Sequence, residues 1–435
     1  MVFSARKPIS QLSECESSET TQKLFDFRGS LKGHEGVITC LSANHRGLLA
    51  SGGREGTYLW DVNTLTQLHS PAGAGVRAAT SAVTWADLRE SSETELLFFG
   101  TQLGYLVCWS RKKDEENFGE EFAHILAHCA EVTSIQFDRP SSRLALCNRG
   151  GLVVVFTVGP NFDLDCVFSR TIVEPVSELK ALAFGNQDAD TRCVMVFGMT
   201  DGRVITIRGT GEVERTKDLG CTIGDAVVST KQLSYFVHLP AEGVALYDLK
   251  TDRRDYTFFL KRTKPQARPH KICYIEEMDF LLCGTDSGEI HVFNTRTRES
   301  IGVITLPVPW AQVIAATRIG SSVAILAASG RDADDANRIY LWVRKDQPEE
   351  RVVVKEVDRS RRWSPATIMV AVLALAMTAV VLYQNVLSPR YGGTVRDKEF
   401  TAIRVPQADF QGPVPQHLDL RAQSTKEGRA IQGAV

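Results

Sequence analysis

The residue types most often used in catalysis and metal binding occur in this sequence, but their spacing does not build a familiar reactive site. Ten cysteines are spread along the chain, and no two have the C-x-x-C spacing of a zinc ribbon or a redox-active dithiol. Residues Arg331–Asn337 resemble half of a calcium loop but lack its central glycine and its terminal glutamate. Gly73–Ala78 fits G-x-G-x-x-A by letters yet opens no evident helix, which makes it a weak dinucleotide site. We therefore predict that the protein is not an enzyme and binds no metal or cofactor.

Composition and charge narrow the class of protein further. The 435 residues include 50 basic and 52 acidic side chains, whereas a nucleic-acid-binding domain is usually strongly basic. We therefore predict no nucleic-acid partner. Most of the cysteines lie within apolar runs, as in Leu281–Cys283, where we expect them to act as small buried hydrophobic residues. The cysteine pattern and the absence of an Asn-x-Ser/Thr site suit a reducing, cytosolic compartment.

The segment Leu31–Asp61 carries the most regular pattern in the chain. It begins near a Gly-His pair, continues as three short apolar runs separated by tight turns, and ends with Trp-Asp. This unit resembles a WD repeat, which forms one four-stranded blade of a β-propeller. The resemblance implies a chain of hydrogen bonds between strands and a Trp-Asp pair at the end of the repeat. The residues that match these positions are His34, Ser51, Trp60 and Asp61.

The first repeat departs from the WD pattern in the turn before Gly56. WD repeats carry an aspartate in this turn, and its carboxylate belongs to the same hydrogen-bonded chain. In this sequence Arg54 and Glu55 occupy the turn, so the aspartate is absent. Because a buried polar network that is only partly satisfied costs stability, we expect the chain of hydrogen bonds to be incomplete in this repeat.

Weaker copies of the unit follow along the chain. His128 begins the third copy as His34 begins the first. Successive copies end on large apolar residues 40 to 51 positions apart, close to the spacing of about 40–45 expected for a four-stranded blade. These closing residues are Trp60, Trp109, Phe156, Ile207, Tyr247, Phe293 and Trp342. We therefore predict an all-β fold, a seven-bladed β-propeller of the WD-repeat type over residues 21–345.

The last blade needs a strand from elsewhere in the sequence, because no fourth strand follows Trp342. Lys23–Phe27 is short, aromatic-rich and partly alternating, as a half-buried strand should be. WD-repeat rings usually close by lending N-terminal residues to the last blade. We therefore assign Lys23–Phe27 as the outer strand of blade seven, paired with the strand that ends at Trp342. Residues 1–20 are predicted to be disordered.

The composition changes after residue 345. Residues 346–363 are polar and charged and are predicted to form a linker. Ala366–Leu387 contains no charged residue, and as a helix it would span about 33 Å, enough for the hydrocarbon core of a membrane. We predict a transmembrane helix at 364–387 and a polar, disordered tail at 388–435. A buried core helix is the alternative for the apolar segment.

The charges beside the apolar segment predict its orientation. Arg359, Arg361 and Arg362 lie close to its start. Because basic residues favour the cytosolic side of a membrane, we predict a single-pass membrane protein with a cytosolic propeller. An endomembrane such as the endoplasmic reticulum is favoured over the plasma membrane.

A basic stretch between the predicted blades five and six is a further candidate for binding. It contains Arg253, Arg254, Lys261, Arg262, Lys264, Arg268 and Lys271. Such a loop could contact anionic lipid headgroups or an acidic partner. The alternative is a solvated loop with no specific function.

Two functions are consistent with these features. WD-repeat propellers usually act as interaction platforms, so the resemblance implies a membrane-anchored, non-enzymatic scaffold that binds proteins through the propeller faces. The order of propeller, single helix and short tail is also similar to that of the endoplasmic reticulum exchange factor for the small GTPase of COPII coats. That family has a glycine-rich loop in its first blade, and the only glycine-rich candidate in this sequence is Ala72–Gly75.

Overall fold

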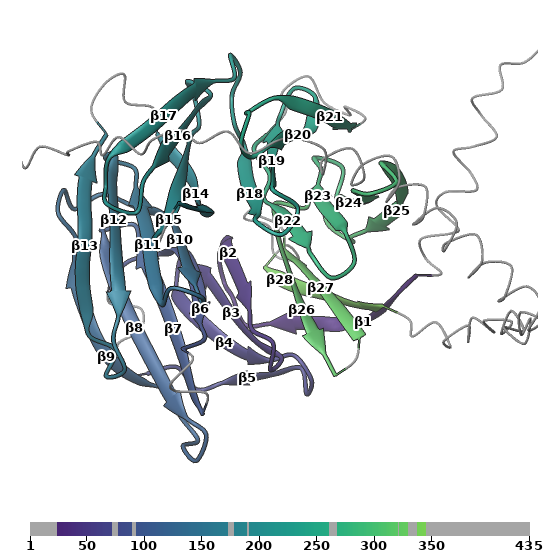
Figure 1. Ribbon diagram of the computed structural model, residues 1–435. Coiled ribbons are helices and arrows are strands. Elements are labelled where there is room, and N and C mark those ends of the chain that lie inside the picture. The colour runs from purple at the N-terminus through teal and green to yellow at the C-terminus, as the bar shows by residue number, and fades with distance from the viewer. Residues whose placement is uncertain are drawn as a thin grey trace, which may run out of the picture. The chain divides into compact units, whose positions relative to one another are not determined.

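The computed structural model describes residues 24–71, 77–88, 93–172, 178–188, 191–260, 268–320, 322–328 and 337–344. Within these ranges, 28 strands form seven four-stranded antiparallel sheets, the blades of a propeller (Figure 1). The segments predicted as 1–20, 346–363, 364–387 and 388–435 lie outside the described residues. Among the residues that the structure describes, no helix is long and apolar enough to cross a membrane.

The first four blades follow one another along the sequence, and the strands of each run in order from the innermost to the outermost. Blade one contains β2 (Ile38–Ala43), β3 (Leu48–Gly53), β4 (Gly56–Asp61) and β5 (Thr66–Leu68). Blade two contains β6 (Thr80–Ala86), β7 (Thr94–Thr101), β8 (Tyr105–Lys112) and β9 (Gly119–Ile125). Blade three contains β10 (Val132–Asp138), β11 (Arg143–Asn148), β12 (Leu152–Val158) and β13 (Leu164–Thr171). Blade four contains β14 (Leu179–Asp188), β15 (Thr191–Gly198), β16 (Arg203–Ile207) and β17 (Val213–Asp218).

The last three blades follow, and blade seven combines strands from both ends of the described chain. Blade five contains β18 (Asp225–Ser229), β19 (Ser234–Leu239), β20 (Gly243–Asp248) and β21 (Arg254–Phe259). Blade six contains β22 (Ile272–Ile275), β23 (Phe280–Gly284), β24 (Glu289–Asn294) and β25 (Glu299–Thr305). Blade seven contains β26 (Val313–Ile319), β27 (Ser322–Ala328), β28 (Arg338–Arg344) and β1 (Phe25–Lys32).

The inner strands close the ring. β2, β6, β10, β14, β18, β22 and β26 each contact the next in this order, and β26 contacts β2 again. All seven predicted closing residues, from Trp60 to Trp342, lie on the third strand of their blades. The prediction of seven blades and the assignment of one closing residue to each are therefore confirmed.

The core lies between neighbouring blades. One apolar cluster joins blades seven and one and includes Leu49, Trp60, Leu326 and Leu341. Because each sheet packs against a neighbour on both faces, its middle strands are buried on both faces. All six residues of β3 are buried, for example, and so are all six of β19. This burial explains why these strands consist mainly of apolar and small residues and do not alternate between apolar and polar ones.

The seam of the ring is closed by the N-terminal strand, as expected from the sequence. β1 pairs antiparallel with β28, and Phe27 lies opposite Trp342. The strand is longer than the predicted Lys23–Phe27, because it continues through an irregularity between Phe27 and Gly29 as far as Lys32. Leu31, which the repeat pattern places at the start of blade one, belongs instead to this strand and is buried between blades seven and one.

Candidate functional site

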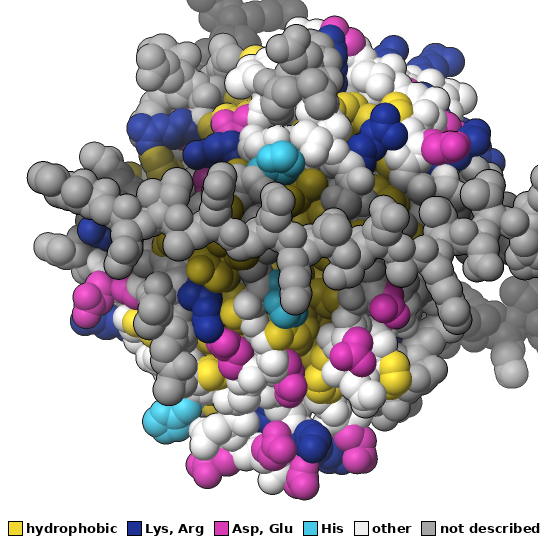
Figure 2. Space-filling model, turned by 90° about the vertical axis from the view of Figure 1, so that its left-hand side faces the viewer, with side chains coloured by type: hydrophobic (Ala, Val, Ile, Leu, Met, Phe, Trp, Pro, Cys, Tyr) yellow, Lys and Arg dark blue, Asp and Glu magenta, His cyan; other side chains and the backbone are white. Residues whose placement is uncertain are grey.

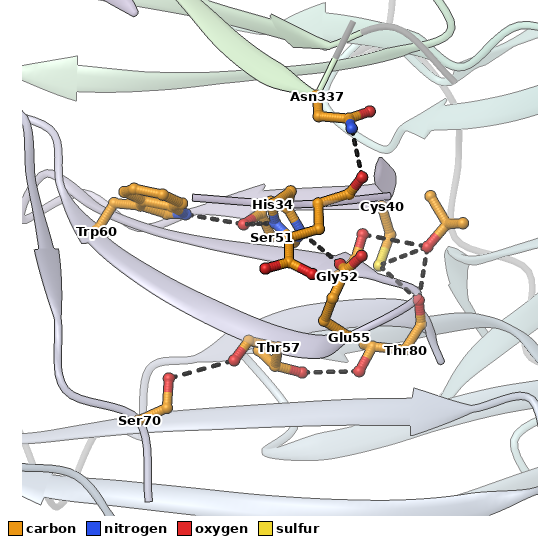
Figure 3. A network of polar contacts seen from close by, with 12 residues as sticks. His34, Cys40, Ser51, Gly52, Glu55, Thr57, Trp60, Ser70, Thr80 and Asn337 are labelled. Carbon is orange, nitrogen blue, oxygen red and sulfur yellow. Dashed lines mark hydrogen bonds and ion pairs between the residues drawn. The ribbon is translucent and has the colours of Figure 1, made fainter. Parts of the chain in front are cut away.

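A buried hydrogen-bonded chain joins the strands of blade one (Figure 3). The indole Nε1 of Trp60 donates to Ser51 Oγ at 2.8 Å, and Ser51 Oγ lies 2.7 Å from His34 Nε2. Because Ser51 accepts the Trp60 proton, its own hydroxyl is free to donate to His34 Nε2. His34 then carries its proton on Nδ1. The three residues match the positions implied by the WD-repeat resemblance.

Glu55 completes this chain. Its Oε2 lies 3.3 Å from His34 Nδ1 and accepts the remaining imidazole proton. The expectation of an incomplete network is therefore wrong, because a glutamate in the turn reaches the histidine that an aspartate would otherwise meet. Burial lowers the pKa of His34, although Glu55 opposes this shift. The neutral imidazole is thus a structural link between strands, and its buried polar atoms are satisfied.

Two other repeat positions stabilise their blades locally. Asp61 accepts hydrogen bonds from the backbone N–H groups of Asn63 at 2.8 Å and Thr64 at 3.4 Å, so it holds the turn between β4 and β5. The ring of Trp342 lies 5.7 Å from that of Phe27 across the β1–β28 pair. These contacts hold the turn and the seam in place.

Trp109 and His128 occupy different surroundings from their counterparts in blade one. Trp109 is fully buried, and its Nε1 is 3.5 Å from Glu120 Oε2. His128 is exposed, has a positive φ of 72°, and its Nε2 lies 3.4 Å from the Thr171 hydroxyl. His34 is a buried link, whereas His128 lies on the surface.

A channel runs through the centre of the ring and is lined by the inner strands. Its narrow part has a volume of about 140 Å³ and includes Ser81, Thr133, Asp225 and Lys271 among its lining residues. A wider part of about 470 Å³ adjoins it and includes the ion pair between Arg192 Nε and Asp138 Oδ2, 3.1 Å apart. We call the face at which each inner strand begins the top face.

The inner strands of blades one to four share an irregularity where they begin. The register shifts around Thr39, Ser81, Thr133 and Lys180. The hydroxyls of Thr39 and Ser81 donate to backbone carbonyls of the next inner strand, at 2.5 Å to Thr80 and 2.7 Å to Val132. The corresponding side chain in blade four is the longer, charged Lys180. The same backbone feature therefore places a cation on the top face, next to Ala181, which lines the channel.

Lys180 lies near an ion pair whose carboxylate is buried and whose lysine is half-buried. Lys271 Nζ donates to Asp225 Oδ1 at 2.9 Å, and Asp225 also accepts the backbone N–H of Ile272. Burial alone would lower the pKa of Lys271, but the carboxylate of Asp225 outweighs it and raises that pKa. Burial, with the nearby charge of Lys271, lowers the pKa of Lys180. Lys180 has no ion pair or hydrogen bond to another described residue.

Further charges surround Lys180 on the top face. Arg149 forms ion pairs with Glu131 at 2.9 Å and with Glu178 at 2.8 Å, and so connects blades three and four. Among the described residues, Lys180 is therefore an unpaired cation within a group of paired charges. A partner that offers a carboxylate or a carbonyl oxygen would satisfy it.

The nearby thiols are unsuited to nucleophilic chemistry. Burial raises the pKa of Cys40 to about 12, that of Cys147 to about 11 and that of Cys273 to about 12. Protonated thiols are poor nucleophiles and poor metal ligands. Within the described ranges, no group of three or more His, Cys, Asp or Glu residues is placed to hold a metal ion.

The described residues of the basic stretch do not form one surface. Arg254 pairs with Glu242 near the start of β21, whereas Lys271 lies past the far end of that strand and enters the channel. Arg268 lies over the ring of Trp310, 3.8 Å from its centroid. Arg253 is exposed. Lys261, Arg262 and Lys264 lie outside the described residues.

Sequence reasoning missed Glu55, Lys180 and the Asp225–Lys271 pair. A usable signal was present, because Lys180 interrupts the apolar run Leu179–Leu182 and Asp225 precedes another. A charge at the start of an inner strand must be paired with another charge or must lie at the channel.

Comparison with known proteins supports the fold. No protein-family model matches the chain, and no curated protein does. The WD40 β-propeller domain of Doa1 is similar with a TM-score of 0.57 and 14% identity, over 73% of this chain and 96% of that one. Sqt1 of Saccharomyces cerevisiae is similar with a TM-score of 0.53 and 11% identity, over 70% of this chain and 86% of that one. The chain therefore has the fold of a seven-bladed WD40 β-propeller, closed by its own N-terminal strand.

Proposed function

We propose that this protein is a non-enzymatic scaffold that binds other proteins with the top face of its propeller. The observation that carries the proposal is Lys180, a partly buried cation on the top face that forms no ion pair or hydrogen bond with another described residue. The carboxylates of Asp225, Glu178 and Glu131 act on it only from a greater distance. An ammonium group in such a place gains most from an acceptor supplied by another molecule. WD40 propellers generally bind proteins, and the solved structures that share the fold support the same class of function.

We propose proteins and not nucleic acids as the partners. The charges that surround Lys180 largely cancel, because Arg149 is paired with two glutamates and Lys271 with Asp225. A balanced surface lacks the extended positive field that phosphate backbones require. It suits a partner segment with an acidic side chain that reaches into the channel mouth.

The membrane part of the proposal rests on the sequence. The uncharged run Ala366–Leu387 would hold the propeller on the cytosolic side of an endomembrane, such as that of the endoplasmic reticulum. A scaffold attached in this way would gather its partners at the membrane surface. The exchange-factor function stays a prediction, since residues 72–75 lie outside the described ranges.

Proximity labelling with the full-length chain tests this function. Lys180→Gln removes the charge, and the fold should tolerate it because burial already disfavours that charge. Lys217→Gln, at an exposed position on β17, is the matched control. We expect the Lys180 variant to lose labelled proteins that the wild type and the control both retain. Identical protein sets from all three chains would refute top-face binding, and a coat GTPase at the head of the set would favour the exchange factor.

A further inference from the structure

A second candidate surface lies on the side of the propeller, between blades two and three. A groove of about 540 Å³ is open there, within the range of about 300–1,000 Å³ typical of ligand sites. One wall is formed by residues Glu121 to Ala127 of β9 and the loop after it. The other is formed by β12, the turn Asn161–Asp163 and β13. The groove is therefore elongated and follows the strand direction.

The floor of the groove is apolar and only partly covered. Phe122, Phe156, Phe162 and Leu164 are half-buried and pack against the core cluster shared by blades two and three. Ile125, at the end of β9, is 55% exposed. Single exposed hydrophobic residues are common on protein surfaces, but several that line one groove indicate a binding site.

The charged residues that line the groove are acidic. Glu121 and Asp163 both line it, whereas none of its lining residues is Lys or Arg. His124 also lines it and stacks on Phe122, with ring centroids 4.6 Å apart. Figure 2 views the side on which β9 and β13 lie in Figure 1 and shows hydrophobic side chains in its middle, with acidic and basic side chains next to each other toward the lower edge.

We propose that this groove binds an extended segment of a partner protein in which large apolar residues stand next to a lysine or arginine. The apolar floor would bury the hydrophobic side chains, and Glu121 and Asp163 would pair with the basic one. The length of the groove along β9 suits an extended backbone. This site is separate from the top face and goes beyond the function proposed above.

The test uses full-length protein in mild detergent and a phage library of random dodecapeptides. We expect the wild type to enrich peptides with a Leu, Ile or aromatic residue close to a Lys or Arg. One enriched peptide is then synthesised and its Kd measured by fluorescence anisotropy. Ile125→Arg should weaken binding at least tenfold, because it places a positive charge at the edge of the groove, where it repels the basic residue of the peptide. Phe259→Arg is the control, since Phe259 is 74% exposed on the outer strand of blade five and should leave Kd within twofold.

A charge exchange tests the acidic end of the groove. Asp163→Lys should weaken the same peptide about tenfold, and a peptide with its basic residue changed to glutamate should recover most of that loss. Lys180→Gln should leave the Kd unchanged. The proposal of a groove site would be refuted by any of three results: no enrichment, enrichment of acidic peptides, or a Kd that Ile125→Arg does not change. A Kd that responds to Lys180→Gln but not to Ile125→Arg would move the site to the top face, supporting the proposed function while refuting this inference.

Discussion

Phe25 and Phe27 lie two positions apart on the closing strand, and the structure assigns them opposite environments. Phe25 is 4% exposed and packs in the cluster of blades six and seven, which includes Ile325 and Trp342. Phe27 is 58% exposed, and its ring lies 5.7 Å from that of Trp342. Mutating each to alanine therefore compares the loss of a buried aromatic ring with the loss of an exposed one.

The expected costs follow from burial. Phe25→Ala removes a buried ring, and such changes cost about 3–5 kcal/mol. Because Phe25 begins its strand and the site can relax, we expect a loss near the low end of that range. Phe27→Ala loses one aromatic pair, about 0.5–1.5 kcal/mol. Urea unfolding of the full-length chain, followed by tryptophan fluorescence, measures both. With an m-value of about 3 kcal/mol/M, Phe25→Ala should lower the midpoint by about 1 M.

The difference between the two variants tests the register of the seam. A large loss for Phe25→Ala and a small one for Phe27→Ala support the register in which Phe27 lies opposite Trp342. Equal losses would mean that Phe25 is not buried more deeply than Phe27. The ring would then close in some other way.

Other features lead to further predictions. Glu55→Ala leaves the His34 imidazole without its carboxylate and should cost about 1 kcal/mol in urea unfolding, whereas Glu55→Gln keeps an acceptor and should cost less; equal costs would argue against the hydrogen bond. Burial, then the neighbouring His270, lowers the pKa of His238 to about 3, so only the unfolded chain binds a proton as the pH falls below about 6.5. Stability should therefore decrease by about 2 kcal/mol between pH 7 and pH 5 through His238 alone, and His238→Gln should remove that part of the slope. Removal of Ser364–Val435 should release the propeller from membranes after a high-salt wash; continued sedimentation would show that this segment is not the anchor.

Most of the fold could be predicted from the repeat pattern of the sequence. Large closing residues at regular spacing, such as Trp60 and Trp109, correctly placed the third strand of each blade. The outer strand of blade seven could also be found, because an unpaired seam requires a strand and Lys23–Phe27 had the right character. Its true end at Lys32 could not be found, since Leu31 also fitted the start of blade one.

The candidate sites were much harder to predict, because they depend on which residues the ring brings together. Proximity in sequence groups Lys271 with Arg253 and Arg254, yet its ammonium meets Asp225 of the preceding blade. Glu55 does not match the aspartate of the WD pattern, although its longer side chain reaches His34. The groove on the side of the propeller combines two blades, and no single repeat reveals it.

The most direct test of top-face binding is site-specific photo-crosslinking in living cells. A benzophenone amino acid is placed at position 150 of the full-length chain, an exposed position of the top face in the turn after β11, so that Lys180 is kept. In a second chain it is placed at position 217 on the outer strand of blade four. If the top face binds partner proteins, irradiation should yield discrete protein adducts from position 150 that are absent from position 217. The same adducts from both positions, or none from position 150, would contradict the proposal that this propeller binds its partners with its top face.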